Sequence, residues 1–253
     1  MYIDGIRVLG SSALPEAAIE QVSVYLGGLP AQYGDARGGI INVTTKGPSG
    51  AFGGGLQLET SVDKFGHSRL GFNLMGPIIK SKSQIGTSLL GYFISGDLFY
   101  QKDERPTAKG VWVSDEDYLR TIEENPLVPS GVASGGTFSA GEFTRDENLY
   151  NSKTNKNMSR YGINLSGKID LKPSRTTNFT VGGQFNYADG QNYANGFFGH
   201  TMFNYDKNVL VLDQTWRVFG RFTQRFAQDA ESSSFVKNIY YSVQFDYSER
   251  KTR

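Results

Sequence analysis

The chain has 253 residues, with 26 lysines and arginines against 25 acidic residues, a net charge of +1 and no cysteine. The lack of cysteine excludes a disulfide framework, a thiolate metal site and a cysteine nucleophile. The balanced charge argues against a nucleic-acid-binding protein, and no window of about 18 apolar residues predicts a transmembrane helix. With 31 glycines and 13% aromatic residues, the composition favours strands and turns over helical bundles.

The first fifty residues predict a small α+β unit. The expected elements are, in chain order, a strand with a turn (2–8), a short helical turn opened by a proline (14–19), a strand (20–26), a glycine-rich loop (27–39), a further strand (40–46) and a linker (47–50). None of these segments alternates regularly between polar and apolar residues, which distinguishes them from the rest of the chain.

From about residue 50 onward, apolar side chains recur at every second position. In residues 161–171, one face carries Tyr, Ile, Leu and Gly while the other carries Gly, Asn, Ser, Lys and Asp. Successive side chains of a strand point to opposite faces, so the pattern predicts about seven strands, each polar on one side and apolar on the other. The expected strands are 52–62, 70–78, 90–100, 161–171, 179–187, 216–226 and 239–248.

Short and long connections alternate between these strands. The long ones are expected at about 102–157 and 189–208, with tight turns such as 172–175 at the opposite end. Strands of about ten residues with short turns on one side and long loops on the other are typical of bacterial outer-membrane barrels. A soluble sandwich or lipocalin-like barrel is the alternative, although its strands are usually nearer five or six residues long.

Three ordered motifs in the first segment resemble one family. They are Tyr-Ile-Asp-Gly (2–5), Pro-Glu-x-x-Ile-Glu-x-Val-x-Val (15–24) and Gly-Gly-x-Pro-Ala-x-Tyr-Gly-Asp-x-x-Gly-Gly-Ile-Ile-Asn-Val-Thr-Thr-Lys (27–46). Together they resemble the C-terminal half of the plug domain of TonB-dependent outer-membrane receptors. A departure from the family pattern is Ser23, where a second acid often stands beside Glu20.

The resemblance implies a mainly β fold. Residues 1–49 would form the C-terminal half of an α+β plug, and residues 50–253 would form the N-terminal part of an antiparallel transmembrane β-barrel, about seven strands of a barrel of 22. Since the first half of the plug, the partner-binding box and a terminal aromatic strand are absent, the resemblance implies a fragment. Two unpaired edges would cost on the order of tens of kcal/mol in lipid, so we expect that the chain cannot sit stably in a bilayer as a transporter by itself.

The resemblance also implies a function. The complete protein would take up nutrients across the outer membrane of a Gram-negative-type cell, driven by an inner-membrane energy-transducing complex of the TonB type through the missing N-terminal box. Outer-membrane lipid and a surface lipoprotein are further implied contacts, while nucleic acid, cofactors and enzymatic activity are not expected. A soluble all-β ligand-binding protein, for example one that binds glycans, is the alternative function.

The sequence also gives candidate site residues. The plug motif implies structural or gating roles for six of them: Tyr33, Gly34, Arg37, Gly38, Gly39 and Asn42. Aromatic residues that could stack on a flat ligand lie in the long loops. These expected ligand contacts are Trp112, Tyr118, Tyr193, Phe197, Phe198 and His200. No catalytic, cofactor-binding or metal-binding residue is expected.

Other patterns have plainer explanations. Gly162-x-x-x-x-Gly167-Lys168 lacks the Ser or Thr of a nucleotide-binding loop and lies in a strand. The acidic run 115–124 predicts a solvated helix with Ser114 as N-cap rather than a glycosidase site. Residues 146–151 do not match a known calcium loop. Arg217, Arg221 and Arg225 share one strand face, where they could attract an anionic substrate or pair with carboxylates.

Overall fold

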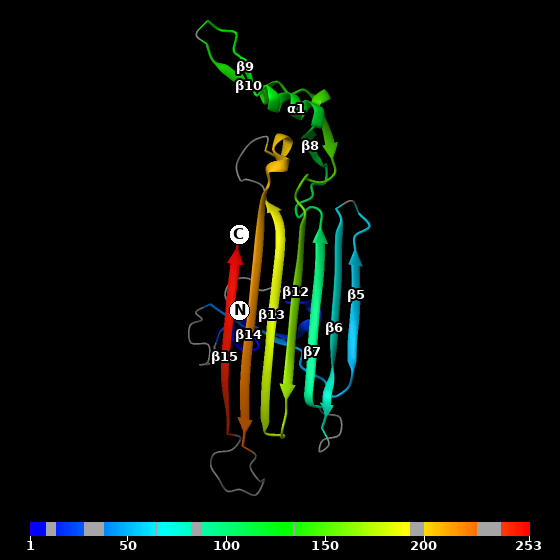
Figure 1. The fold of residues 1–253 in the computed structure, drawn as a ribbon, viewed down its shortest axis with the longest axis vertical. Coiled ribbons are helices and arrows are strands. Elements are labelled where there is room, and N and C mark those ends of the chain that lie inside the picture. Colours follow the sequence, from blue (N-terminus) through cyan, green and yellow to red (C-terminus); the bar gives the residue numbers. More distant parts are fainter. Residues whose placement is uncertain are drawn as a thin grey trace.

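The computed structural model describes residues 1–8, 14–27, 38–63, 65–81, 88–133, 135–192, 200–226 and 239–253. Its main element is a seven-stranded antiparallel sheet with the order β15-β14-β13-β12-β7-β6-β5 (Figure 1). The strands are β5 (Gly53–Thr60), β6 (His67–Lys80), β7 (Ser88–Gln101), β12 (Arg160–Leu171), β13 (Thr177–Asn192), β14 (Val209–Arg225) and β15 (Tyr240–Thr252). Each of the seven strands expected from the sequence overlaps one of these.

The register keeps the two faces of this large sheet distinct. Leu165 of β12 lies opposite Phe185 of β13 and Gly96 of β7, while Asn164 lies opposite Asn186 and Asp97 on the same two strands. The ladder from β7 through β12 and β13 to β14 runs without a register shift. Alternation in each single strand therefore adds up to one apolar face and one polar face across the whole sheet.

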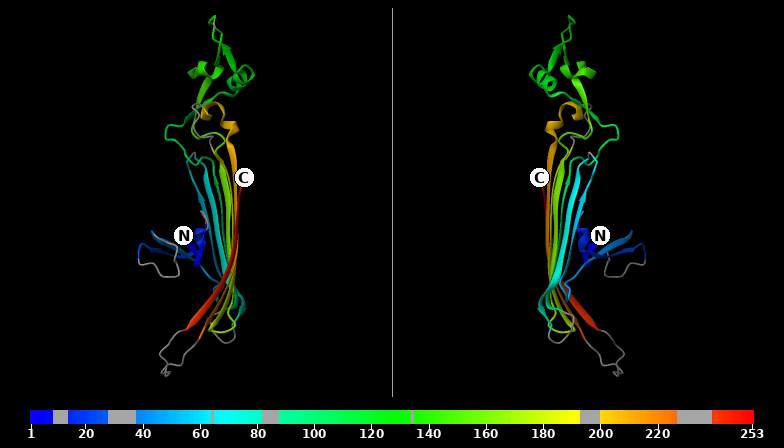
Figure 2. Two further views of the ribbon diagram at one scale, coloured as in Figure 1. Left: turned by 90° about the vertical axis from the view of Figure 1, so that its left-hand side faces the viewer. Right: turned by 90° about the vertical axis from the view of Figure 1, so that its right-hand side faces the viewer.

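Residues 1–49 contain a second, small sheet. It has the order β2-β1-β4-β3, made of β1 (Tyr2–Ile3), β2 (Ile6–Arg7), β3 (Ile19–Tyr25) and β4 (Ile40–Thr45), and β1 runs parallel to β4. The 3₁₀ helix η1 (Glu16–Ala18) begins after Pro15 and packs against β6 and β7. Figure 2 shows the large sheet edge-on, with the small sheet projecting from one face.

Several short elements lie beyond one end of the large sheet (Figure 1). They are β8 (Val111–Ser114), α1 (Glu116–Glu124), β9 (Leu127–Pro129), β10 (Thr137–Ser139), η3 (Ala140–Phe143), η4 (Asp146–Asn148), β11 (Leu149–Ser152), α2 (His200–Phe203) and η5 (Tyr205–Lys207). β8 pairs with β11, and α2 packs against β8. The two long connections thus meet at this end.

Helix α1 corrects one detail of the sequence analysis, because its N-cap is Asp115 and not Ser114. The Asp115 carboxylate accepts a hydrogen bond from the Asp117 amide at 3.0 Å. Ser114 is the last residue of β8 and is fully buried. A side chain held in the strand packing cannot turn to the first free amides of the helix, whereas the next residue can.

The large sheet is open, with β5 and β15 as its edges, and no closed barrel forms among the described residues. None of the helices within the described ranges has the length and apolar character needed to cross a membrane.

Candidate functional site

The burial of the two faces of the large sheet is the reverse of that in a soluble protein. On β12 the polar residues Asn164, Ser166 and Asp170 are buried, with 6–9% of their surface exposed. Their apolar neighbours Leu165 and Ile169 are 37% and 48% exposed. The polar face is the one that carries the small sheet, so we call it the inner face and the apolar one the outer face. A water-soluble sheet would bury the apolar face instead.

Asp4 is the centre of the contact between the two sheets. It occupies the turn between β1 and β2 with φ of 53°, and Gly5 follows with φ of 79°. Aspartate and glycine tolerate this left-handed region better than most residues. The Asp4 carboxylate accepts hydrogen bonds from the Thr45 amide at 2.9 Å and the Thr45 hydroxyl at 2.7 Å. The turn is thereby fixed to the end of β4.

The large sheet binds this turn through two cations. Lys168 of β12 places Nζ 3.0 Å from Asp4 Oδ1 and also donates to the Thr45 carbonyl at 3.0 Å. Arg221 of β14 donates to the Asp4 carbonyl and, at 2.7 Å, to Gln244 Oε1 of β15. The Asp4 and Lys168 side chains are 5% and 10% exposed, so water screens their attraction little. This contact joins β1, β4, β12, β14 and β15.

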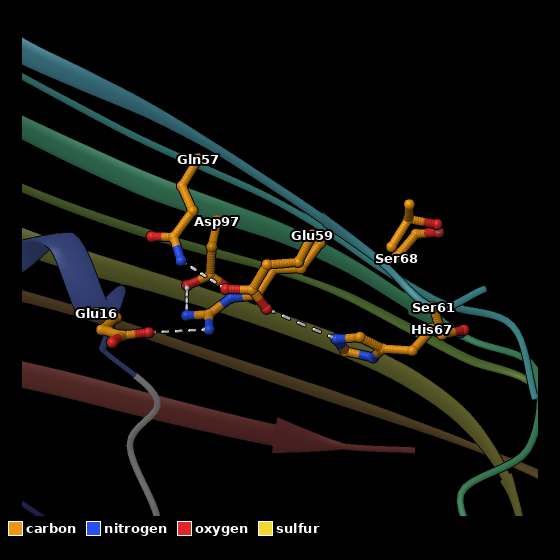
Figure 3. A network of polar contacts seen from close by, with 9 residues as sticks. Glu16, Gln57, Glu59, Ser61, His67, Ser68 and Asp97 are labelled. Atoms are coloured by element: carbon orange, nitrogen blue, oxygen red, sulfur yellow. Dashed lines mark hydrogen bonds and ion pairs between the residues drawn. The ribbon is translucent and has the colours of Figure 1, made fainter. Parts of the chain in front are cut away.

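A second contact lies on the inner face near η1 (Figure 3). Glu16 points from η1 toward Arg69 of β6, with 3.3 Å between Oε2 and NH1, and Arg69 NH2 lies 3.7 Å from Asp97. Asn164 donates to Asp97 at 3.0 Å, and Asn186 donates to Asn164 at 2.8 Å. A row of polar side chains therefore crosses four strands beneath the small sheet, in which Arg69 is shared by the carboxylates of Glu16 and Asp97.

Arg217 is a further buried charge of the inner face. Its side chain is 6% exposed, and Nε lies 3.6 Å from Asp246 of β15. Lys168, Arg217 and Arg221 thus supply cations, while Asp4 and Asp246 supply carboxylates. The sequence analysis assigned the arginines to one strand face, but it considered Lys168 only as part of a nucleotide-loop-like pattern and gave Asp4 no role of its own. Asp4 was visible only as part of the Tyr-Ile-Asp-Gly motif.

The structure describes half of the expected plug-motif residues. Tyr33, Gly34 and Arg37 lie outside the described residues. Gly39 has φ of 144°, and an added Cβ there would lie 3.0 Å from the Tyr25 carbonyl. Asn42 belongs to β4, opposite Tyr2 and Ser23. Gly38 precedes this strand and is exposed.

The expected ligand contacts are described in part as well. Trp112 belongs to β8 and is 56% exposed. Tyr118 belongs to α1, and its hydroxyl lies 3.1 Å from the Thr144 hydroxyl. His200 begins α2, which packs against β8. Tyr193, Phe197 and Phe198 lie outside the described residues.

Hydrogen bonds join the two long connections. Asn208 donates to the Asn157 carbonyl at 2.9 Å and to the Lys156 carbonyl at 3.3 Å. A hydrogen bond with Tyr150 raises the pKa of Lys156, and burial raises the pKa of Tyr205. The described residues contain no group of three or more His, Cys, Asp or Glu that could hold a metal ion.

No family model matches the chain. A segment of 99 residues is 36% identical to a probable TonB-dependent siderophore receptor, PirA of Acinetobacter baumannii, and covers 37% of this chain and 12% of that receptor. The crystal structure of the siderophore receptor PirA from the same organism aligns with 93% of this chain and 35% of that chain, at 16% identity and a TM-score of 0.40. The chain therefore spans a minor part of the length of these relatives. Together with the motifs between residues 2 and 47, the sequence identity confirms the resemblance of this chain to TonB-dependent outer-membrane receptors.

Proposed function

We propose that the chain is part of a TonB-dependent receptor in the outer membrane of a Gram-negative-type cell. Residues 1–49 would be the C-terminal half of its plug, and residues 50–253 the first strands of its barrel wall. The observation that carries this proposal is the exposure of the apolar face of the large sheet, while the polar face is covered by the small sheet. An outer surface in contact with hydrocarbon and a hydrated interior require this arrangement.

We propose further that the complete receptor takes up an iron-loaded siderophore, with energy supplied by a TonB-type partner. The support is the name of the relative, a probable TonB-dependent siderophore receptor with 36% identity over 99 residues. The chain by itself would not be competent for transport, because β5 and β15 are edges without a strand partner among the described residues.

The expected site residues keep their proposed roles in this function. The plug motif from Tyr33 to Asn42 would be structural or gating. The aromatic residues of the two long connections would contact ligand at the outer end of the wall, where Asn208 joins the connections to each other. The alternative of a soluble glycan-binding protein gains no support from the similar proteins. It would also leave the exposed apolar face unexplained.

The two tryptophans allow a direct test of which face meets the apolar phase. Trp216 lies mid-strand on the outer face of β14, with its ring 5.1 Å from that of Tyr247, and Trp112 lies on β8 beyond the sheet. The chain would be refolded in a detergent whose acyl chain carries bromine, which quenches indole fluorescence on contact. We expect strong quenching in Trp112→Phe, which retains Trp216, and weak quenching in Trp216→Phe.

Equal, weak quenching of both variants would contradict the proposal, because a soluble sheet would hide its apolar face from detergent. Trp112 serves as the matched control, since both variants lose one indole and keep one. Transport is tested separately, by uptake of radioactive iron bound to a siderophore. Deletion of the gene for the complete receptor that contains this chain is expected to lower uptake, whereas the chain expressed alone is expected to give none above background.

A further inference from the structure

A groove on the inner face of the large sheet remains without a role in this description. It consists of two adjoining hollows of about 890 and 410 Å³, which share Arg221, Thr223 and Arg225 of β14. The larger hollow lies between the small sheet and β14–β15, and the smaller one extends to the turn between β12 and β13. We call the whole feature the basic groove. Its larger hollow alone is within the size range of small-molecule sites.

Near the turn between β12 and β13, the charged residues that are described in the lining of the basic groove are all cations. The smaller hollow is lined by Lys172, Arg175, Arg221 and Arg225, and its described lining residues include no carboxylate. Lys172 lies 3.9 Å from Asp170, and Arg221 donates to two neutral oxygens. Within the described ranges, no carboxylate oxygen lies within 4 Å of Arg175, Arg221 or Arg225. Three guanidinium groups in one concave surface, with no counter-charge among the described residues, attract an anion.

The remaining lining residues indicate the shape of the ligand. Hydroxyl groups of Thr176, Thr177 and Thr223 make the wall beside the arginines polar, and each is hydrogen-bonded to a neighbouring side chain. At the other end, Tyr240 lies opposite Arg225 in the ladder of β14 and β15, lines the larger hollow and is 68% exposed. Arginines match the geometry of anionic oxygens, and an exposed aromatic ring favours a flat or apolar body. A ligand that fits both ends carries several anionic oxygens on an aromatic or aliphatic frame.

The position of the basic groove distinguishes it from the expected ligand contacts. It reaches the short turn 172–176, at the end of the sheet opposite α1 and α2 (Figure 1). Short turns face the periplasm in outer-membrane barrels. In the proposed receptor, the basic groove therefore lies on the periplasmic side of the small sheet, where the transported ligand would leave the barrel.

We propose that the basic groove is an exit-side binding site for an anionic iron chelate. This inference rests on the proposed function and adds to it the charge of the cargo. Arg175, Arg221 and Arg225 would hold the anionic oxygens, and the exposed ring of Tyr240 would contact the ring or chain that bears them. A neutral chelate of the same size gains nothing from the arginines, so the site discriminates by charge.

The test is a direct binding experiment on the purified chain in detergent, in which calorimetry measures the affinity. The probes are inorganic pyrophosphate, an anionic ferric tris-catecholate complex and a neutral ferric tris-hydroxamate complex. We expect both anions to bind, the catecholate complex more tightly, and the neutral complex not to bind. Because the Debye length shortens as the salt concentration rises, binding of both anions is expected to weaken between low and physiological ionic strength.

The variants are chosen so that folding is not at risk. Arg175 and Arg225 are both exposed, and the double variant Arg175→Gln/Arg225→Gln is expected to weaken anion binding by about tenfold for each lost arginine. The matched control is Arg120→Gln/Arg145→Gln, which removes two exposed arginines at the opposite end and is expected to bind like the unaltered chain. Circular dichroism checks the fold, and Arg175→Gln alone serves if the double variant misfolds.

Three results would overturn the inference. They are no binding of either anion at low salt, equal binding by the double variant and its control, or a catecholate complex that binds no more tightly than pyrophosphate. The bromine-quenching experiment separates this failure from that of the proposed function. Quenching of Trp216 without anion binding would leave the receptor proposal intact and would reject the proposed binding site. Anion binding without quenching removes the receptor, and with it the exit-side role.

Discussion

Lys168 Nζ lies 3.0 Å from Asp4 Oδ1, and this pair joins the middle of the large sheet to the first turn of the small one. Both side chains are nearly buried, and both also bind Thr45. Removal of one partner leaves the other charge buried without compensation, which costs far more than the loss of an exposed ion pair.

We expect Asp4→Asn to lower the free energy of unfolding by about 3 kcal/mol. Asparagine keeps the size of aspartate and also accepts a positive φ, so the change removes the charge without straining the turn. The measurement is urea unfolding in detergent, combined with amide exchange in β1 and β4. The control is Glu16→Gln, which breaks the more exposed pair with Arg69 and is expected to cost under about 1 kcal/mol. Equal losses in the two variants would count against a central role for Asp4.

A pair of strand glycines tests the packing of the inner face. A Cβ on Gly182 would lie 2.6 Å from Phe219 Cζ and 2.9 Å from the Gly167 carbonyl, whereas a Cβ on Gly220 would have no neighbour within 4 Å. We expect Gly182→Ala to destabilise the sheet by about 1–3 kcal/mol. Gly220→Ala should be neutral or slightly stabilising, since alanine loses less backbone entropy than glycine. Thermal unfolding of both variants measures the difference, and similar melting temperatures would refute the close contact.

The two faces of β14 are expected to respond differently to charge. Val218 lies on the outer face and is 47% exposed, and Thr215 lies on the inner face of the same strand. In contact with an apolar phase, Val218→Lys should cost about 2–4 kcal/mol, while Thr215→Lys, which adds a cation beside Arg217 and Arg250 on the polar face, should cost under about 1 kcal/mol. Unfolding midpoints in detergent give the comparison. If the outer face met water, the lysine at position 218 would be tolerated as well as the one at 215.

The start of α1 supplies a local prediction. Asp115 accepts from the Asp117 amide at 3.0 Å, so Asp115→Ala should weaken the helix by about 1 kcal/mol. Amide exchange at residues 116–118 is the measurement and should accelerate. Ser114→Ala is expected to leave these amides unchanged, because the serine side chain donates to the Asp115 carbonyl rather than capping the helix. Faster exchange in the serine variant would restore Ser114 as the cap.

The large sheet was predictable from the sequence because its signal is periodic. The alternation in 161–171 defines both β12 and its two faces, and the turn residues at 172–175 set the next strand antiparallel. The contacts of Asp4 were not predictable, because they depend on how the small sheet lies on the large one. Lys168 is one of many polar residues on its face, and nothing in its local sequence marks it as the partner of Asp4. The assignment of the N-cap failed for a related reason, since burial of Ser114 comes from tertiary packing.

Strand β1 has only two residues, and it pairs with β2 on one side and with β4 on the other. Strand β4, in contrast, is held along its whole length by β3. A mechanical pull applied at the N-terminal end would therefore load two residue pairs on each side of β1, together with the Asp4 turn, before it reached the longer ladder. Strand length sets the order of yielding, so the first part of the small sheet to detach under tension would be the segment that ends at Arg7.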